Sequence, residues 1–374
     1  MYTQQPPKDT AVTEIIQEID ALVQKVNSYP NLPPKLQEKI NLMIERIRRM
    51  ARMGSYSTEF EVVSKYIDWV TQIPWGNNSL DVIDLKQARQ TMDTHHYGMN
   101  PIKEMILDYL AVMKLQKQRE GSTTGDNKVY KTKAPILCFA GLQGVGKTTM
   151  AKSIAEALHR KFIRIPMGAL GSVRELRGIP RTTLEATPGL ITKALIEAGT
   201  MNPIILLDEI DKTSGQEGLR SDMMAFLLEI LDPKQNKHFS DYYVDQPMNL
   251  SQVFFITTAN TTGTISTALL DRLEVIRFTS YSDEEKITIG KRYLLPRVLE
   301  DLGLTTTQVT FTEDVWPQIV RPLGFDAGIR QLERNVTKIC RKATRKIVEE
   351  NIQTVEINVL NIREFLPVDV AILN

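Results

Sequence analysis

The feature that most constrains the fold is the segment 141–148, which reads Gly-Leu-Gln-Gly-Val-Gly-Lys-Thr. It matches the pattern G-x-x-x-x-G-K-[ST], whose glycines let backbone N–H groups turn inward around a phosphate. The apolar run 135–140 before it predicts a buried strand, and residues 148–158 after it predict a helix. A glycine-rich turn with no ligand is the alternative. The motif and both flanks together favour a phosphate-binding loop, with the positive end of a helix beside the phosphate.

Four further apolar runs predict strands, and helical stretches separate them. These runs are residues 162–165, 203–208, 253–258 and 274–278. Continuous apolar runs without alternation are typical of central strands that are covered on both faces. Strands that alternate with helices favour a parallel sheet with helices on both sides. We therefore predict an α/β fold with a parallel five-stranded sheet.

Helical patterns precede this α/β region. Apolar residues recur at spacings of three and four in residues 11–26, 34–53 and 57–72, and a Pro-Trp-Gly break follows at 74–76. We predict an N-terminal helical module over residues 1–76, in which residues 1–10 are a disordered leader.

The rest of the chain divides in two. Residues 84–93 and 100–119 predict two more helices, and a polar, glycine-bearing linker follows at 120–127. Beyond Tyr281 the patterns become helical again, at residues 283–299, 313–320 and 326–349. We predict a large α/β domain over residues 77–281 and a small α-helical domain over residues 282–374.

Composition excludes several classes of protein. The 46 Lys and Arg residues nearly balance the 45 Asp and Glu residues, so no polyanionic partner is indicated. The basic cluster at residues 46–52 lacks interleaved aromatic residues, which favours a solvated helix face over a nucleic-acid site. Two cysteines cannot build a disulfide framework. No run approaches the roughly 18–20 apolar residues of a membrane span, so we expect a cytoplasmic protein without a membrane or nucleic-acid partner.

Two acidic residues follow the third predicted strand. Residues 204–209 read Ile-Ile-Leu-Leu-Asp-Glu, a pattern that fits a Walker B strand. Asp208 would hold Mg²⁺ together with Thr148, and Lys147 would reach the β- and γ-phosphates. Glu209 would orient and polarise a water molecule. Adjacent carboxylates are otherwise often helix caps, but the phosphate loop about sixty residues earlier favours ATP hydrolysis.

Three further polar residues are candidates for the same site. Asn260 ends the fourth predicted strand and would hold the attacking water, unless it is an ordinary turn asparagine. Arg272 is a candidate finger for a neighbour's γ-phosphate, or one half of a surface salt bridge. Arg330 falls in the first turn of a helix that Asp326 would cap, where the helix dipole disfavours a cation. A nearby anion would remove this conflict, and ATP phosphate, Asp326 or Glu333 could supply it.

Together these segments resemble AAA+ P-loop ATPases, and specifically the ATPase module of the Lon protease family. The resemblance covers about residues 34–366. It is carried by Ile73-Pro74-Trp75, His96-Tyr97-Gly98, residues 141–148, Arg177-Gly178, Thr187-Pro188-Gly189, residues 207–212, Leu231-Asp232-Pro233, Phe239-Ser240-Asp241, residues 270–277 and residues 328–334.

The resemblance implies a hexameric ring with Mg²⁺ and ATP between subunits and a polypeptide threaded through a central pore. It implies that Asn260 acts as sensor 1, Arg272 as a finger in trans and Arg330 as sensor 2. The implied ATP contacts are Gly141, Gln143, Gly144, Val145, Gly146, Lys147, Thr148 and Thr149, with His96, Tyr97 and Gly98 beside the adenine. Without the family, His96 would be interpreted as a loop histidine.

The chain departs from the family pattern in two places. The first pore loop of the family carries an aromatic and then an aliphatic residue, whereas this chain has Thr183 and Leu184, followed by Glu185. Threonine lacks the large rigid surface of an aromatic ring, so residues 214–221 are a second candidate for the grip. In addition, no serine lies in a Gly/Pro-rich nucleophile setting with a lysine after it, so we expect no peptidase site in this chain.

Two functions remain open. The first is an ATP-driven ring motor that unfolds, translocates or remodels unfolded or misfolded proteins, with a separate or fused peptidase or with none. The second is an ATP-controlled assembly or regulatory ring with little threading. The Lon-like segments favour the first, and Thr183 favours the second.

Overall fold

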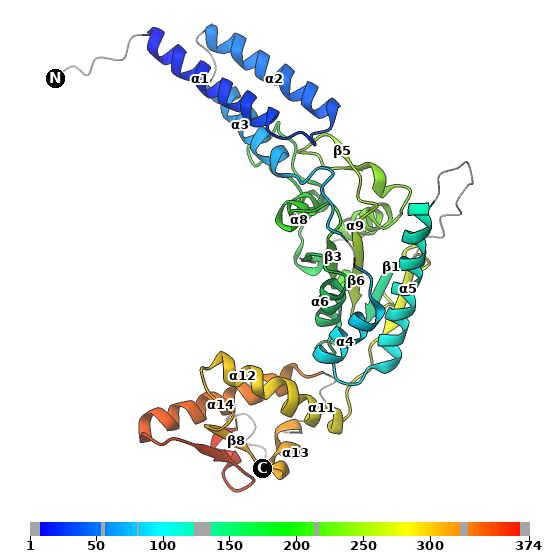
Figure 1. The fold of residues 1–374 in the computed structure, drawn as a ribbon, viewed down its shortest axis with the longest axis vertical. Coiled ribbons are helices and arrows are strands. Elements are labelled where there is room, and N and C mark those ends of the chain that lie inside the picture. The colour runs from blue at the N-terminus through cyan, green and yellow to red at the C-terminus, as the bar shows by residue number, and fades with distance from the viewer. Residues whose placement is uncertain are drawn as a thin grey trace, which may run out of the picture. The chain divides into compact units, whose positions relative to one another are not determined.

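The computed structural model describes residues 8–53, 57–80, 82–122, 136–212, 217–321 and 328–366. The chain has an α/β fold around a parallel five-stranded sheet (Figure 1). The strands lie in the order β2 (Phe162–Pro166), β3 (Ile204–Asp208), β6 (Phe254–Ala259), β1 (Ile136–Ala140) and β7 (Leu273–Arg277). The five predicted strands and the predicted fold class are therefore confirmed.

The strand sequences explain the sheet. Every residue of β3 and β6 is buried, as expected for central strands that carry unbroken apolar runs. In β2 and β3, Phe162 lies opposite Ile204, and in β1 and β7, Ile136 lies opposite Leu273; both pairs are parallel. Sequence distance does not decide which strands pair, since β1 joins β7 more than a hundred residues away.

The chain divides into two compact units. One comprises residues 1–81, 159–256 and 266–272, and the other comprises residues 82–158, 257–265 and 273–374. Strand β6 contributes residues to both units.

The first unit contains the N-terminal helices α1 (Lys8–Asn27), α2 (Pro34–Arg52) and α3 (Ser57–Gln72), which pack side by side (Figure 1). Their apolar stripes are buried, with Ile19, Ile40 and Tyr66 completely inaccessible. The predicted leader was too long, because α1 begins at Lys8; residues 1–7 lie outside the described residues. The unit also contains α7 (Val173–Arg177), α8 (Leu190–Ala198), α9 (Glu217–Ile230), α10 (Thr267–Leu270) and the short strands β4 (Phe239–Ser240) and β5 (Pro247–Met248).

The second unit contains α4 (Leu85–His95), α5 (Asn100–Ser122) and α6 (Lys147–Ala157). Asp84 caps α4, since its carboxylate accepts hydrogen bonds from the amides of Lys86 and Gln87. The predicted linker at 120–127 is wrong for its first three residues, which continue α5; residues 123–127 lie outside the described residues.

The C-terminal part of this unit is a helical lid with a small ribbon. It contains α11 (Asp283–Ile289), a π-helical turn (Gly290–Leu294), α12 (Leu295–Asp301), α13 (Trp316–Val320), α14 (Arg330–Glu350) and α15 (Ile362–Phe365). The strands β8 (Val309–Phe311) and β9 (Val355–Ile357), which were not predicted, pair in parallel.

Two predictions for the lid are corrected. The single helix predicted over 283–299 is interrupted by the π-helical turn, where Gly290 packs directly against the ring of Trp316. The predicted cap of α14, Asp326, lies outside the described residues, and the residue in the cap position is Ile329.

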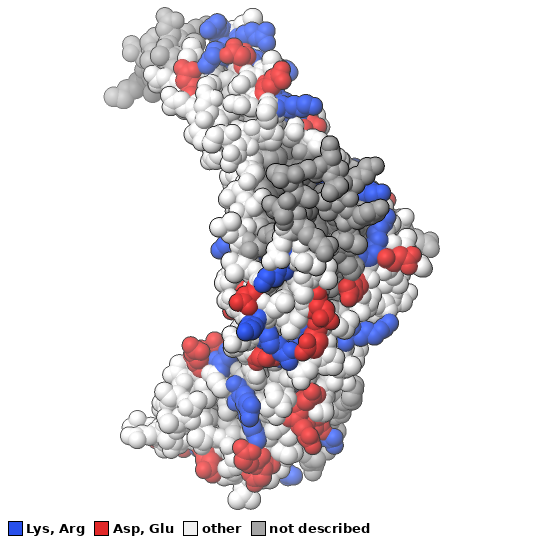
Figure 2. Space-filling model, turned by 45° about the vertical axis from the view of Figure 1, so that its right-hand side comes forward, with Lys and Arg blue, Asp and Glu red and all other residues white. Residues whose placement is uncertain are grey.

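The surface agrees with the balanced composition. On the face shown in Figure 2, Lys and Arg side chains alternate with Asp and Glu side chains and form no single basic field. Within the described ranges, no helix has the length and apolar character that crossing a membrane requires.

Candidate functional site

The phosphate loop connects β1 to α6, and its backbone requires glycine at three positions. Gly141, Gly144 and Gly146 have φ angles of 155°, 80° and 94°, which a side chain would strain. The space around them is also closed, because a Cβ on Gly141 would lie 2.5 Å from the carbonyl oxygen of Phe278. The glycine pattern is thus explained by a tightly turned loop against a neighbouring strand end.

Lys147 is the first residue of α6, and its ammonium group turns back into the loop. Its Nζ donates to the carbonyl oxygens of Gly141 and Leu142, the latter at 3.0 Å, and to Oδ1 of Asn260 at 3.1 Å. The Nδ2 of Asn260 is buried and has no hydrogen-bond partner among the described residues. A lysine cation and an unsatisfied amide donor therefore lie together at this loop, an arrangement that fits an anionic ligand such as a nucleotide phosphate.

The remaining loop residues hold the loop in place. Val145 is completely buried, and its carbonyl oxygen accepts the hydroxyl of Tyr281 at 3.2 Å. Thr149 donates its hydroxyl to the carbonyl of Gly146 at 2.9 Å. Gln143 is exposed and Thr148, the second residue of α6, is half-buried.

The first turn of α14 lies directly on the phosphate loop. The amide of Ile329 donates to the carbonyl oxygen of Gly144 at 3.1 Å, and a Cβ on Gly144 would lie 3.2 Å from Cγ of Arg330. Glu333 is paired with Arg297, so it is not the anion that resolves the position of Arg330. Among the described residues Arg330 forms no ion pair, and its side chain packs beside Gly144 of the phosphate loop.

The His96-Tyr97-Gly98 segment lies against the helix that follows the loop. His96 is buried, its Nε2 lies 3.1 Å from Oγ of Ser153, and it is hydrogen-bonded to the backbone of Thr149. Desolvation by burial, reinforced by Lys103 and His95, lowers the pKa of His96 to about 4. The imidazole is therefore neutral at pH 7 and packs the segment onto α6.

The turn after His96 reaches the loop through Tyr281. Gly98 and Met99 both have positive φ angles, 65° and 56°. The Oη of Tyr281 lies 3.9 Å from Sδ of Met99, and a Cβ on Gly146 would lie 3.3 Å from the same Oη. Burial raises the pKa of Tyr281, so its hydroxyl stays protonated and donates to the loop.

The acidic pair lies in the first unit, at the end of β3. Asp208 is almost completely buried, and both Nε and Nη2 of Arg164 lie 2.6 Å from its Oδ2. Glu209 has a φ of 59°, a conformation that a non-glycine residue rarely adopts. Its Oε1 lies 2.8 Å from Nζ of Lys212. Each carboxylate thus has a cationic partner from its own unit.

Arg272 also lies in the first unit, just beyond α10. Its Nη2 is 3.5 Å from Oδ2 of Asp232, and its Nη1 is 3.5 Å from the carbonyl oxygen of Leu228. Both distances are at the outer limit for hydrogen bonds. The salt bridge considered as the alternative is therefore present, but it is a loose one.

The predicted pore residues lie on a short turn between α7 and α8. Residues Ile179 and Thr187 form an antiparallel bridge at its base, and the amide and hydroxyl of Thr183 both bond to the carbonyl of Pro180. Leu184 is fully exposed at the tip. The second candidate for the grip, residues 214–221, lies partly outside the described residues.

Comparison with known proteins decides the family. The profile of the ATPase family associated with various cellular activities matches residues 137–281, and that of the Lon protease AAA+ ATPase lid domain matches residues 300–355. Lon protease 2 of Thermus thermophilus is 42% identical over 352 residues, which are 94% of this chain and 43% of that protein. Lon proteases of Herpetosiphon aurantiacus (Lon protease 2) and Desulforamulus reducens are each 40% identical over about 90% of this chain. This chain carries the AAA+ ATPase module of the Lon family.

The module spans about 40% of the length of these curated Lon relatives, whereas nearly all of this chain is covered by the match. As a member of the AAA+ ATPases it belongs to a family of ATP-binding proteins.

The predicted site residues of the Lon-family module fall into two sets. The phosphate loop, Asn260, Arg330 and His96 belong to one compact unit, and the contacts given above bring them together. Asp208, Glu209 and Arg272 belong to the other unit, as do the tip residues Thr183 and Leu184.

Sequence reasoning missed three residues beside these positions. Arg164 interrupts an otherwise apolar strand, and Lys212 follows Glu209 by one helical turn; both spacings are visible in the sequence. Tyr281 carries no comparable signal, because its contact with Val145 joins residues 136 positions apart.

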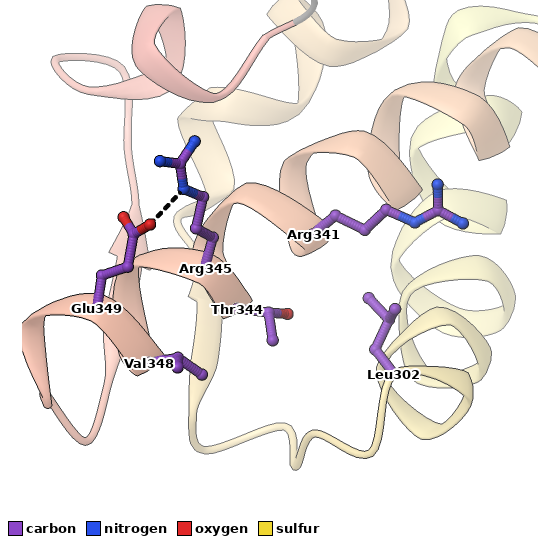
Figure 3. A pocket seen from close by; sticks show the side chains of 6 residues that line it. All are labelled: Leu302, Arg341, Thr344, Arg345, Val348 and Glu349. Carbon is purple, nitrogen blue, oxygen red and sulfur yellow. Dashed lines mark hydrogen bonds and ion pairs between the residues drawn. The ribbon is translucent and has the colours of Figure 1, made fainter.

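The lid also has a surface pocket that none of the predicted site residues lines. Its volume is about 390 Å³, and its lining is Leu302, Arg341, Thr344, Arg345, Val348 and Glu349 (Figure 3). Arg345 and Glu349 pair across one rim at 2.7 Å, while Leu302 and Val348 form its apolar walls.

Proposed function

We propose that this Lon-family module hydrolyses ATP with Mg²⁺ and uses the energy to unfold, translocate or remodel protein substrates. The observation that carries the proposal is the contact, at the phosphate loop, between Lys147 and Asn260, whose amide Nδ2 is unsatisfied. In this proposal the chain works in the cytoplasm as a homo-oligomeric ring, six subunits in the family's pattern, and a fused or separate peptidase can act on what it delivers.

Each loop residue has a distinct task in binding. The backbone N–H groups of Gly144 and Gly146 would hold the phosphates, whereas the amide of Gly141 donates to the carbonyl oxygen of Ala259 and fixes the start of the loop. Lys147 would exchange its carbonyl contacts for the β- and γ-phosphates. Arg330, at the start of α14, would add a positive charge from the lid. His96, Tyr97 and Gly98 would border the adenine, with the neutral His96 ring fixing their position on α6.

The chemical step needs charge and a positioned water. Thr148 and Asp208 would hold Mg²⁺, which would supply positive charge to the phosphate oxygens. Glu209 polarises the attacking water after releasing Lys212, and the Nδ2 of Asn260 donates to that water or to the γ-phosphate. Before substrate arrives, Lys212 holds the Glu209 carboxylate, and the φ of 59° sets the direction in which this side chain leaves the main chain.

Two variants test the hydrolytic site. Lys147→Ala should weaken ATP binding by about 10- to 100-fold, because it removes a charged hydrogen bond. Glu209→Gln should leave binding within a few fold and lower turnover by about 10²–10⁴, because only the base-like carboxylate is lost. Binding is measured with a fluorescent ATP analogue and turnover by phosphate release. Normal turnover in Glu209→Gln would exclude this role for Glu209.

The exposed tip at Thr183 and Leu184 is the proposed contact with substrate. Leu184 offers an apolar side chain that is fully accessible, and burying a leucine stabilises a contact by about 1.5–3 kcal/mol at most. Thr183 supplies only a methyl group and a hydroxyl.

The small side chain of Thr183 at this tip also supports the second function, a regulatory ring that threads little polypeptide. An unfolded polypeptide, reduced carboxymethylated lactalbumin, separates the two. In the motor, it should stimulate ATPase activity, Leu184→Ala should abolish the stimulation but spare basal turnover, and Thr183→Tyr should strengthen it. If wild type and both variants hydrolyse ATP in stable rings but none responds to the polypeptide, the regulatory ring is correct.

A further inference from the structure

Arg181 fastens the segment 179–187, which carries Leu184 at its tip, to the N-terminal helices. Its guanidinium carbon lies 4.2 Å from the ring centroid of Tyr66 on α3. Its Nη1 lies 3.5 Å from Sδ of Met43 on α2. Arg181 is three residues before Leu184, so these contacts are made at the base of the tip.

The ring that receives Arg181 is held rigidly. Tyr66 is completely buried, its hydroxyl donates to the carbonyl oxygen of Val244 at 2.8 Å, and its ring packs against Tyr243 at a centroid distance of 5.9 Å. Burial raises the pKa of Tyr66, so the hydroxyl remains a donor. Because the ring is already immobile, it loses little further entropy when the guanidinium packs on it, which favours a lasting contact.

Asp245 provides a second contact for Arg181, and we call the contacts of Arg181 with Tyr66, Met43 and Asp245 the clamp. Asp245 adopts a positive φ of 51°, and its Oδ2 lies 3.5 Å from Nη2 of Arg181. The same carboxylate pairs with Lys39 of α2, whose Nζ also donates to the Asp245 carbonyl at 3.0 Å. Arg181 therefore touches α2, α3 and the 243–245 segment at once, although its side chain is one-fifth exposed.

The other side of the tip is fixed through Asp241. Asp241 is completely buried and accepts hydrogen bonds from the amide of Gly189 at 2.8 Å and the hydroxyl of Thr192 at 2.5 Å. The start of α8, which follows the tip, is thus attached to Asp241. On this side α8 also contacts α3, because Nζ of Lys193 lies 5.9 Å from the ring centroid of Trp69, whereas Arg181 contacts α2 and α3 from within the tip segment itself.

We propose that Arg181 is a positioning residue through which the N-terminal helices α2 and α3 set the position of the tip that carries Leu184. The effect of this positioning on substrate binding at Leu184 rests on the proposed function, whereas the contacts of Arg181 with α2 and α3 do not. Movement of α2 and α3 would be transmitted to the tip through the Arg181–Tyr66 contact.

Hydrogen exchange of residues 179–187 in the full chain tests the clamp directly. Arg181→Gln removes the charge, and Arg181→Lys keeps the charge but loses the flat stacking group. Both should speed exchange of the tip amides, by roughly 2- to 30-fold from the usual strength of a cation–π contact. Tyr66→Phe, which keeps the ring, should leave the tip within about twofold of wild type, whereas Tyr66→Leu should speed its exchange.

Arg174 provides the matched control, since it is an exposed arginine on neighbouring α7. Arg174→Gln should leave exchange of the tip unchanged. Equal exchange in wild type, Arg181→Gln and Arg181→Lys would overturn the clamp, and so would an equal acceleration in Arg174→Gln.

ATPase stimulation by reduced carboxymethylated lactalbumin tests the consequence. Arg181→Gln and Arg181→Lys should lose most of the stimulation while basal turnover stays within about twofold of wild type. A wild-type protein without stimulation would contradict the proposed motor, whereas the exchange result would still decide the clamp. Faster exchange with full stimulation would overturn the role of Arg181 in positioning the tip for substrate.

Discussion

At the scale of single residues, the acidic pair Asp208 and Glu209 is held by cationic side chains of the same unit. Asp208 is nearly inaccessible, and an unpaired carboxylate would be costly there. Arg164 offsets this cost by placing two nitrogens 2.6 Å from one carboxylate oxygen. The same guanidinium competes with any metal ion for that oxygen.

This competition predicts the effect of Arg164→Gln on metal dependence. Removing the cation should lower the Mg²⁺ concentration for half-maximal ATP-analogue binding by about three- to tenfold, because charge repulsion and competition for Oδ2 both disappear. The measurement is an Mg²⁺ titration in the Glu209→Gln background, with Arg174→Gln as control. A shift to higher Mg²⁺ would show that Arg164 instead holds Asp208 in its binding position.

His96 makes folding stability depend on pH. Its pKa is lowered from the model-peptide value of 6.5 to about 4. Between pH 6.5 and pH 4, His96 is therefore protonated in the unfolded chain but neutral in the folded chain. Stability should therefore be undiminished above pH 6.5 and fall between pH 6.5 and 4.

Urea unfolding at pH 7 and pH 5 measures this effect. The contribution of His96 to the free energy of unfolding should fall by about 2 kcal/mol between these values. His96→Gln, which does not titrate, should show a correspondingly smaller loss between pH 7 and pH 5. An identical loss in wild type and variant would assign the pH dependence to other groups.

At the scale of elements, the lid shows how one close contact interrupts a helix. The π-helical turn between α11 and α12 brings Gly290 onto Trp316, where a Cβ would lie 2.5 Å from Cζ3 of the indole. Trp316 is buried and also packs on Phe311 of β8. The absence of a side chain at residue 290 therefore lets α11, α13 and β8 meet.

Gly290→Ala should destabilise the lid despite the better helix propensity of alanine. Overpacking costs about 1–3 kcal/mol, whereas the propensity gain is about 1 kcal/mol. In a Trp316→Leu background the same substitution should cost less or become stabilising, as a double-mutant cycle by urea unfolding would show. Equal effects in both backgrounds would mean that the indole is not the obstacle.

At the scale of the whole molecule, the proposed ring gives Arg272 a second partner. Inside the chain it makes loose contacts with Asp232 and with the carbonyl oxygen of Leu228, and we propose that it reaches the γ-phosphate bound by a neighbouring subunit. The three-domain division at residues 1–76, 77–281 and 282–374 is proposed with it, on the support of separate profile matches to residues 137–281 and 300–355.

Arg272→Ala should abolish most turnover and leave nucleotide affinity within a few fold. In other phosphoryl-transfer enzymes, an arginine finger supplied in trans raises the turnover rate by about 10³–10⁵. Asp232→Asn is the matched control, because it removes the partner inside the chain and should retain turnover. Mixing Arg272→Ala with Lys147→Ala protein should restore part of the activity, because some interfaces then pair an intact ATP site with an intact finger. No recovery in rings that exchange subunits would contradict action in trans.

Local sequence determined the elements of this protein. The five strands, the helix α3, the phosphate loop and the placement of Arg330 in the first turn of α14 were all predicted, because each depends on short-range periodicity or backbone sterics. The family was also predicted, since its motifs are local strings. The ends of elements were predicted less accurately, as at Lys8 and Ser122, because helix ends depend on weak capping and fraying effects.

Tertiary structure alone decided which distant residues meet. Arg181 and Tyr66 are more than a hundred positions apart, as are Tyr281 and Val145, and no pattern in either segment specifies its partner. The contact between Gly290 and Trp316 likewise joins residues of two different helical segments. The physical reason is that backbone propensity acts over a few residues, whereas packing and burial act between segments that only the folded chain brings together.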